Sequence, residues 1–343
     1  MVDIIKLAVI GIGGVGRAFL KLLNDKKKSL LKEGLEFTVN YIMNSKGGIY
    51  KENGFNLNQC LDLSNQKVYT KDNYENVNFD ELLQKNNIDF LVELTPTNKT
   101  TGEPGMTYIK KALKHGINVV TSNKGPILLA YKRLKQIAKD NNVQLGIGCT
   151  TGGALPTING GVIDLAGSNI LSIEGVLNGT TNYIINEMEK GGNTYEQALL
   201  KAQRQGIAET DPYLDVEGWD TAIKLLILTN VLFDVDRTLD DVSVKGITHI
   251  TPKDIQDALN EGIKFKLIGK SYKANNEIKI EVGLKKIGSE NPFYFVDGKN
   301  KAVRYQSDTL GDLTIMGGQS GIVAAAASVL RDIVNIKRGY RFI

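Results

Sequence analysis

Cysteine and histidine are both scarce in this chain. Its two cysteines, Cys60 and Cys149, lie far apart and form no C-x-x-C pair, so the sequence predicts neither a disulfide framework nor a zinc site. The only two histidines, His115 and His249, exclude a catalytic scheme built on several imidazoles. So few cysteines in 343 residues are typical of a reducing compartment, and we expect a cytoplasmic protein.

Long apolar runs and a charge of one sign are also absent. No apolar stretch reaches the roughly 18 residues of a transmembrane helix, and the N-terminus lacks the basic region of a signal peptide. The net charge is +4, from 42 basic and 38 acidic residues, which is too balanced for a dedicated nucleic-acid binder. The small excess either attracts an anionic cofactor or has no meaning. We expect a small-molecule substrate, with no nucleic acid and no membrane as partner.

Short apolar runs alternate with helical patterns through the first half of the chain. The runs that predict buried strands are 4–10, 36–43, 88–94, 117–121 and 143–148. Helical patterns cover 17–31, 107–115 and 126–141. The polar stretch 47–78 is expected to form loops with short elements. This alternation predicts a parallel, doubly wound α/β sheet.

The pattern changes after Thr150. Strands and helices no longer alternate, which is typical of an α+β unit. Helices are expected near 155–166, 181–190, 195–205, 218–232 and 322–334. Strands are expected near 170–177, 263–272, 277–287 and 292–296.

A G-x-G-x-x-G pattern follows the first apolar run and precedes a helix, which is the context of a dinucleotide fingerprint. Gly11 permits a tight turn, Gly13 lets the backbone approach a pyrophosphate, and Gly16 lets helix and strand pack closely. The helix N-terminus adds N–H donors and partial positive charge. An ordinary glycine-rich turn is the alternative. The predicted dinucleotide site comprises Gly11, Ile12, Gly13, Gly14, Val15 and Gly16.

The end of the second strand bears on the choice of nicotinamide cofactor. An NAD enzyme usually places an acid there to bind the ribose hydroxyls, whereas this chain has Asn44, Ser45 and Lys46. Lys46 suits a 2′-phosphate, which favours NADP over NAD. A solvated loop lysine is the alternative.

Two lysines are candidate catalytic groups. Lys124 follows a strand and so lies at the edge where open α/β sheets bind ligands, although an ordinary surface lysine is an equal alternative. Lys224 stands four residues after Asp220 on a helix apolar enough to be largely buried. A buried ion pair stabilises poorly, so function is favoured over a partly exposed pair. A neighbouring carboxylate raises a lysine pKa. Lys224 is therefore either a general acid or a group that polarises a carbonyl while water relays the proton.

Together these motifs resemble the homoserine dehydrogenase family from about residue 7 to 334. The most specific stretches are N-G-T-T-N-Y-I, which begins at Asn178, and E-T-D-P…D…D-x-x-x-K from Glu209 to Lys224. The family implies NAD(P)-dependent interconversion of L-homoserine and L-aspartate 4-semialdehyde, a step toward threonine and methionine. It also implies a homodimer formed through the second domain.

The resemblance implies a role for each candidate residue. Lys224 would donate or accept the proton at the substrate oxygen, and Lys124 would bind substrate and cofactor. Glu209 would bind the substrate's α-amino group. Asp220 would be catalytic together with the two lysines and would also support Glu209. The other substrate-site residues would be Asp215 and Thr180, and further cofactor contacts would come from Thr95, Ser122, Gly206 and Gly321.

One departure from the family pattern concerns a metal. The family often has a glutamate before a cation-binding loop, and this chain has Gly148 there. The backbone carbonyls of Thr151, Gly153 and Leu155 remain an alternative for Na⁺, without the carboxylate ligand.

The expected fold class is α/β, a Rossmann domain over 1–150 completed by 307–343. An α+β substrate-binding and dimerisation domain is inserted over 151–306, and no C-terminal amino-acid-sensing module is expected. Two other functions stay open. One is an aldehyde-oxidising semialdehyde dehydrogenase with Cys149 as its nucleophile, and the other is a non-catalytic dinucleotide-binding sensor.

Overall fold

The computed structural model describes residues 2–58, 60, 75–275 and 277–342, which form two compact units. One unit comprises Met1–Thr150 with Gly321–Ile343, and the other comprises Thr151–Ser320. The chain returns to the first unit at Gly321, later than the expected 307. The reason is that 301–317 forms a hairpin in the sheet of the second unit, which the sequence pattern did not predict.

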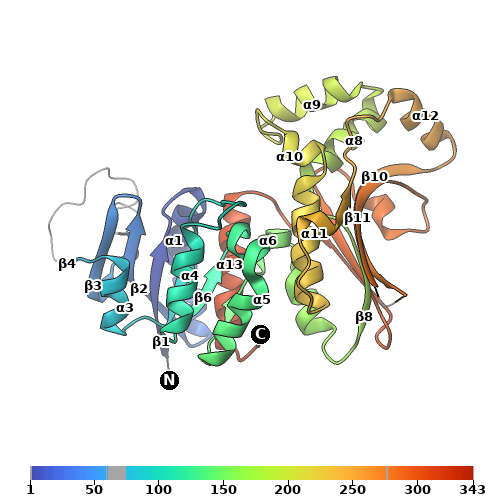
Figure 1. Cartoon of the computed structure of the whole chain (residues 1–343). Helices are drawn as coiled ribbons and strands as arrows, with labels where there is room; N and C mark the ends of the chain where they lie inside the picture. Colours follow the sequence, from blue (N-terminus) through green and yellow to red (C-terminus); the bar gives the residue numbers. More distant parts are fainter. Residues whose placement is uncertain (1, 59, 61–74, 276, 343) are drawn as a thin grey trace. The chain divides into compact units, whose positions relative to one another are not determined.

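The first unit contains a sheet of the order β4-β3-β2-β1-β5-β6-β7. Strands β2, β1, β5, β6 and β7 are parallel neighbours, while β3 and β4 run antiparallel at one edge. The structure therefore confirms the predicted parallel, doubly wound core of this sheet (Figure 1). The strands are β1 (Asp3–Ile10), β2 (Leu35–Asn44), β3 (Gly47–Phe55), β4 (Glu75–Asn76), β5 (Phe90–Glu93), β6 (Asn118–Thr121) and β7 (Leu145–Gly146).

Helices pack in two groups beside this sheet. Helix α1 packs with α13, the last helix of the chain, and α4 packs with α5. Because α13 joins α1 over the parallel strands, the C-terminal segment completes the first unit. The helices are α1 (Gly14–Lys32), α3 (Phe79–Lys85), α4 (Gly105–Lys114), α5 (Lys124–Asp140), α6 (Cys149–Gly152) and α13 (Ile322–Lys337).

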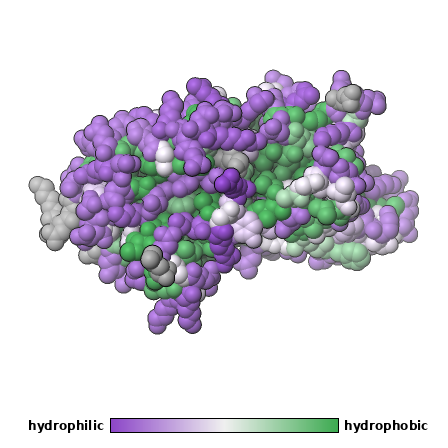
Figure 2. Space-filling view, turned by 90° about the horizontal axis from the view of Figure 1, so that it is seen from below, coloured by the Kyte–Doolittle hydropathy of each residue, from purple (hydrophilic) through white to green (hydrophobic). Residues whose placement is uncertain are grey.

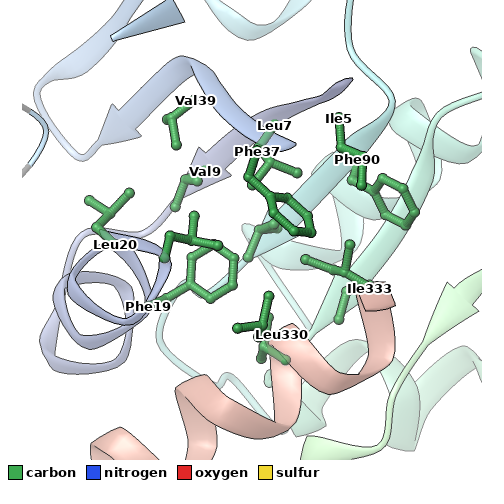
Figure 3. Close-up of a cluster of buried hydrophobic side chains, with 14 of the residues drawn as sticks. Ile5, Leu7, Val9, Phe19, Leu20, Phe37, Val39, Phe90, Leu330 and Ile333 are labelled. Atoms are coloured by element: carbon green, nitrogen blue, oxygen red, sulfur yellow. The ribbon is translucent and has the colours of Figure 1, made fainter. Parts of the chain in front are cut away.

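The hydrophobic core of the first unit explains why the end of the chain belongs to it. Figure 3 shows Phe19 of α1 and Ile333 of α13 facing apolar side chains of the central strands. Strand β1 contributes Ile5, Leu7 and Val9, all fully buried. Burial of this kind contributes roughly 1.5–3 kcal/mol for each large apolar side chain.

The stretch 47–78 contains more regular structure than the sequence predicted. Strand β3 pairs antiparallel with β2, and Ile49 and Tyr50 are buried. The strand was missed because its sequence, GGIYKENGF, has few apolar residues and no clear alternation. Residues 59 and 61–74 of this stretch lie outside the described residues.

The second unit is built on a six-stranded sheet of the order β13-β12-β8-β10-β11-β9. Its pairs are antiparallel except for β9 with β11. This agrees with an α+β unit. The strands are β8 (Ile170–Val176), β9 (Val242–Val244), β10 (Lys264–Ala274), β11 (Glu277–Ile287), β12 (Lys301–Ser307) and β13 (Asp312–Gly317).

The two central strands of this sheet are β8 and β10. Helices α8, α11 and α12 pack on β10. Helix α11 is buried on nearly every face, as its apolar sequence predicts. The helical segments are α7 (Thr157–Asn159), η1 (Gly160–Asp164), α8 (Gly179–Gly191), α9 (Tyr195–Arg204), α10 (Tyr213–Val216), α11 (Trp219–Leu232), η2 (Leu239–Asp241), α12 (Pro252–Asn260) and η3 (Pro292–Phe295).

Two elements of the second unit differ from the sequence prediction. The expected strand 292–296 is the 3₁₀ turn η3, because Pro292 opens it and Asn291 accepts a hydrogen bond from the Phe293 N–H at 2.9 Å. The expected helix 155–166 is a short α7 followed by the π-helical turn η1. Gly161 allows this turn to approach Leu232, which would meet a Cβ at 2.6 Å.

Among the described residues, no helix combines the length and the hydropathy that are needed to cross a membrane. Hydrophilic side chains cover much of the face seen in Figure 2, with hydrophobic patches between them.

Candidate active site

The turn between β1 and α1 has the shape that the glycine pattern predicts. Gly11 has φ +94°, and a Cβ there would lie 2.4 Å from the carbonyl carbon of Leu94. A Cβ at Gly16 would lie 2.2 Å from the carbonyl oxygen of Gly11. At Gly13, by contrast, no atom lies within 4 Å of that position. Gly11 and Gly16 therefore allow close packing, while Gly13 leaves its backbone open to a ligand.

This turn stands at the switch point of the sheet. Strand β1 lies between β2 and β5, and the chain winds outward on both sides, which is where open α/β sheets bind ligands. Helix α1 begins at Gly14, and no described side chain caps it. Its first N–H groups therefore remain available to an anion. The residues of this turn fit the pyrophosphate of a dinucleotide.

A buried carboxylate joins the ends of the next two strands. Glu93 ends β5 and accepts hydrogen bonds from the Thr95 N–H at 2.8 Å and the Thr121 hydroxyl at 2.7 Å. Burial raises the pKa of Glu93, and these hydrogen bonds oppose that rise. Asn123 donates to the Thr95 hydroxyl at 3.3 Å and caps α5, whose first residue is Lys124. Glu93 thus holds the two segments that carry Thr95 and Lys124, a role that the sequence did not reveal.

The end of β2 is a tight hairpin turn. Asn44 pairs with Gly47, so Ser45 and Lys46 are the two residues of the turn. The Asn44 side chain accepts a hydrogen bond from the Lys46 N–H at 2.8 Å. Both turn residues are exposed, and the turn contains no carboxylate.

The second unit contains a network centred on Lys224 of α11. Its ammonium lies 2.6 Å from an oxygen of Asp220 and donates to the Leu177 carbonyl at 2.9 Å. The amide of Asn178 donates to Asp220 at 2.9 Å and to Asp215 at 2.6 Å. The side chains of Lys224 and Asp220 are 16% and 14% exposed, so the pair is neither a surface pair nor fully enclosed.

Three separate segments bring these groups together. Asn178 follows β8 and caps α8 through the Thr181 N–H at 2.9 Å. The short helix α10 carries Asp215, and Gly218, with φ +84°, turns the chain into α11. The sequence analysis selected Asp215, Asp220 and Lys224 but assigned no role to Asn178. Its position just before a helix signals a cap, and only the fold shows its two carboxylate contacts.

The loop between α9 and α10 carries Glu209, whose side chain is exposed. Gly206, with φ +66°, follows the end of α9. Gln203 donates to the Glu209 carbonyl at 3.1 Å, and the Thr180 hydroxyl donates to the Ile207 carbonyl at 3.1 Å. Thr180 thus attaches this loop to the start of α8, two residues after Asn178.

The segment expected to hold a cation lies where the second unit begins. Thr151 forms a hydroxyl–hydroxyl hydrogen bond with Thr157 at 2.6 Å, and Gly153 has φ +62°. The Leu155 carbonyl accepts a hydrogen bond from the Thr157 N–H at 2.8 Å. Lys301, which is 5% exposed, donates from its ammonium to the Gly152 carbonyl at 2.5 Å. A positive charge therefore already lies within this segment, at the Gly152 carbonyl.

Cys149, the candidate thiol nucleophile, is buried at the start of α6 and is 8% exposed. In the first unit, the structure brings the glycine turn, Thr95, Ser122 and Lys124 to the carboxyl ends of neighbouring parallel strands. In the second unit it brings Lys224 together with Asp220 and Asp215. The doubly wound first unit carries a dinucleotide-binding turn, and the α+β second unit carries a lysine–carboxylate network. These features together are those of a nicotinamide-dependent oxidoreductase.

Comparison with known proteins agrees and is more specific. The homoserine dehydrogenase family model matches residues 156–334, and the model of the NAD-binding domain of homoserine dehydrogenase matches residues 11–147. The chain belongs to the homoserine dehydrogenase family. Its reaction is therefore the NAD(P)-dependent interconversion of L-homoserine and L-aspartate 4-semialdehyde, a step in amino-acid biosynthesis.

Two relatives and one solved structure match over nearly their whole length. A homoserine dehydrogenase of Methanocaldococcus jannaschii is 38% identical, with 96% of this chain and 98% of the relative covered. An NAD(+)-dependent homoserine dehydrogenase of Pseudomonas canavaninivorans is 33% identical, with 96% of each chain covered. The crystal structure of a putative homoserine dehydrogenase of Archaeoglobus fulgidus is 34% identical, with a TM-score of 0.86 and 97% and 99% of the two chains covered.

Proposed function

We propose that Lys224 transfers the proton in the homoserine dehydrogenase reaction. The observation that carries this proposal is the network in which Asn178 orients Asp220 and Asp220 contacts the Lys224 ammonium. When the aldehyde is reduced, its oxygen gains negative charge, and a positioned ammonium stabilises that charge and supplies the proton. In the opposite direction the lysine accepts the proton of the homoserine hydroxyl.

Asp220 and the Leu177 carbonyl position the lysine for this role. The Leu177 carbonyl accepts a hydrogen bond from the Lys224 ammonium at 2.9 Å. The Asp220 carboxylate forms an ion pair with the same ammonium at 2.6 Å. Two fixed acceptors leave one of the three ammonium N–H groups to point toward a substrate oxygen. Asp215 holds the network together through Asn178.

The loop 205–212 supplies the substrate's other contact. Homoserine carries an α-ammonium group, which needs a carboxylate, and the exposed side chain of Glu209 offers one. Thr180 fixes this loop to α8, close in sequence to the cap residue of the Lys224 network. We assign Gly206 to the cofactor side of the same loop, where its positive φ gives the backbone a sharp turn.

The first unit holds the nicotinamide dinucleotide. Gly11 to Gly16, including Ile12, Gly14 and Val15, and the start of α1 bind the pyrophosphate. Thr95, Ser122, Lys124 and Gly321 line the nicotinamide side, with Lys124 also reaching the substrate. The bound cofactor supplies or takes the hydride. Na⁺ is not included in the proposed cofactor set, because the buried ammonium of Lys301 contacts the carbonyl of Gly152, within the segment that would bind it.

We favour NADP over NAD on the evidence of the β2–β3 turn. Ser45 and Lys46 are exposed, and the turn that they form contains no carboxylate. It therefore lacks the group that would bind the two ribose hydroxyls of NAD and would repel the 2′-phosphate of NADP. We further propose that the protein is cytoplasmic and forms a homodimer through the second unit. Sedimentation of the purified protein would test the dimeric state.

A spectrophotometric assay tests the proposed function. Oxidation of L-homoserine is followed through the absorbance of the reduced nicotinamide, with NAD⁺ and NADP⁺ in parallel. We expect turnover with both and a lower KM for NADP⁺. Glu209→Gln keeps the shape of the side chain but removes its charge, so it should raise KM for homoserine more than it lowers kcat. Folded protein without turnover on either cofactor would refute the proposal.

A further inference from the structure

Lys301 is a buried lysine that the proposed mechanism does not use. It begins β12, its side chain is 5% exposed, and its ammonium donates to the main-chain carbonyl of Gly152 at 2.5 Å. Burying an ammonium is costly unless hydrogen bonds compensate. A long aliphatic residue would fill the same space without that cost, so the charge itself calls for an explanation.

The turn that receives this ammonium is tightly confined. A Cβ at Gly318 would lie 2.6 Å from the Leu155 nitrogen, and the Gly152 carbonyl also accepts the Leu155 N–H at 3.3 Å. The turn 152–155 directly follows the passage into the second unit after Thr150, and 317–320 directly precedes the passage back. Lys301 pairs with Gly317 in the β12–β13 hairpin. Its ammonium therefore links the incoming segment to the outgoing one.

The same turn presents the backbone carbonyls that the sequence suggested as Na⁺ ligands. The Lys301 ammonium lies 3.4 Å from the position of a Cβ on Gly153, the central residue of that set. The position where a carboxylate ligand was expected is Gly148. A second cation beside a buried ammonium would be repelled strongly, because charges are screened weakly in the interior of a protein. These residues do not fit a bound monovalent cation.

We propose that the Lys301 ammonium is a tethered replacement for a monovalent cation at the turn 152–155. An ammonium donates N–H groups to carbonyl oxygens, as the Lys301 ammonium does to Gly152, and a hard cation is also bound by carbonyl oxygens, so the ammonium can take the place of a cation in this turn. The wild-type protein then needs neither Na⁺ nor K⁺. Removing the tether creates a site for a free cation.

The experiment compares the wild type with Lys301→Ala and with Lys299→Ala. Lys299 is exposed and two residues away, which makes it a matched control. Each protein is dialysed into choline chloride and its thermal unfolding is measured with choline, sodium, potassium, ammonium or methylammonium chloride at equal ionic strength. We expect the same Tm in all salts for the wild type and Lys299→Ala. Lys301→Ala should have a lower Tm in choline and regain it with one or more of the small cations.

A Na⁺-specific rise in the wild-type Tm over choline would overturn the proposal, and so would a folded Lys301→Ala protein that no cation stabilises. If Lys301→Ala does not fold, ²³Na relaxation measured on the wild type decides the matter. Site-specific broadening would overturn the proposal, and its absence would support it. Homoserine oxidation in choline chloride gives an activity readout that rests on the proposed function. If the wild-type protein has no such activity in any of the salts, the proposed function is refuted. The unfolding result alone then decides this inference.

Discussion

The candidate sites of the two units are built from different parts of the chain. In the first unit, the turn at Gly11–Gly16 depends on its backbone and on glycines that have no side chain. A Cβ at Gly11 would lie 2.4 Å from Leu94. In the second unit, the network of Lys224 is made of side chains from α10, α11 and the start of α8. A backbone site is encoded in one short stretch of sequence, whereas a side-chain network depends on the whole fold around it.

The sharpest test of this contrast is Lys224→Met, which should abolish chemistry and spare cofactor binding. A missing proton-transfer group typically costs about 10²–10⁴-fold in rate. We expect kcat to fall by that range while the Kd for NADPH, measured by quenching of protein or nicotinamide fluorescence, stays unchanged. Lys253→Met, at an exposed lysine of α12, is the control. Undiminished turnover by Lys224→Met would remove this lysine from the mechanism.

The next test separates two glycines of the same turn. Gly11→Ala places a side chain at φ +94° against the backbone of Leu94, and a strained backbone of this kind costs on the order of 1–3 kcal/mol. Urea unfolding should show that loss. Gly13→Ala has open space around its Cβ and an ordinary φ of −79°, so it should keep full stability and lose affinity for the dinucleotide. Equal stability of the two variants would contradict this division of roles.

A smaller effect is expected at Glu93, which joins the strand ends of the first unit. Burial raises its pKa above the ordinary value of 4.5, so its protonated form is favoured in the folded state. Its contribution to stability is therefore fully present below pH 4.5 and is lost as the pH rises through the raised pKa. Glu93→Gln mimics the protonated form. The free energy of unfolding of the wild type relative to Glu93→Gln should fall as the pH rises from 4.5 toward neutrality, and a constant difference would show that Glu93 does not titrate there.

The smallest effect is expected at Lys46. An exposed ion pair is worth about 0.2–1 kcal/mol, which corresponds to a change of roughly 1.4- to 5-fold in affinity. Lys46→Ala should therefore raise KM for NADP⁺ within that range and leave KM for NAD⁺ unchanged. Measuring both at low and at high salt gives a second check, because the difference should shrink as salt screens the charge.

Sequence analysis predicted most of the parallel sheet because its strands are short apolar runs with clear boundaries. It missed β3, whose nine residues include Lys51, Glu52 and Asn53 but few apolar side chains, and it read the Pro292 turn as a strand. The local sequence pattern is enough to predict the apolar parallel strands, whereas β3 forms a strand because it pairs with β2.

The same distinction holds within the candidate site. The glycine turn and the Asp220–Lys224 pair follow from spacing along the chain, since four residues apart on a helix are neighbours. The contacts of Asn178 join residues 37 and 42 positions away, and that of Lys301 joins residues 149 positions away. No local pattern encodes such distances, so these two residues emerged only from the fold.

The hairpin tip at Ser45 and Lys46 bears on how readily this enzyme changes during evolution. Both residues are exposed and contribute no side chain to the core, so replacing them requires no repacking. If the tip selects the cofactor as proposed, lineages can exchange one coenzyme for another through substitutions at two neighbouring codons. Such substitutions would leave the proposed catalytic residues of the second unit unchanged.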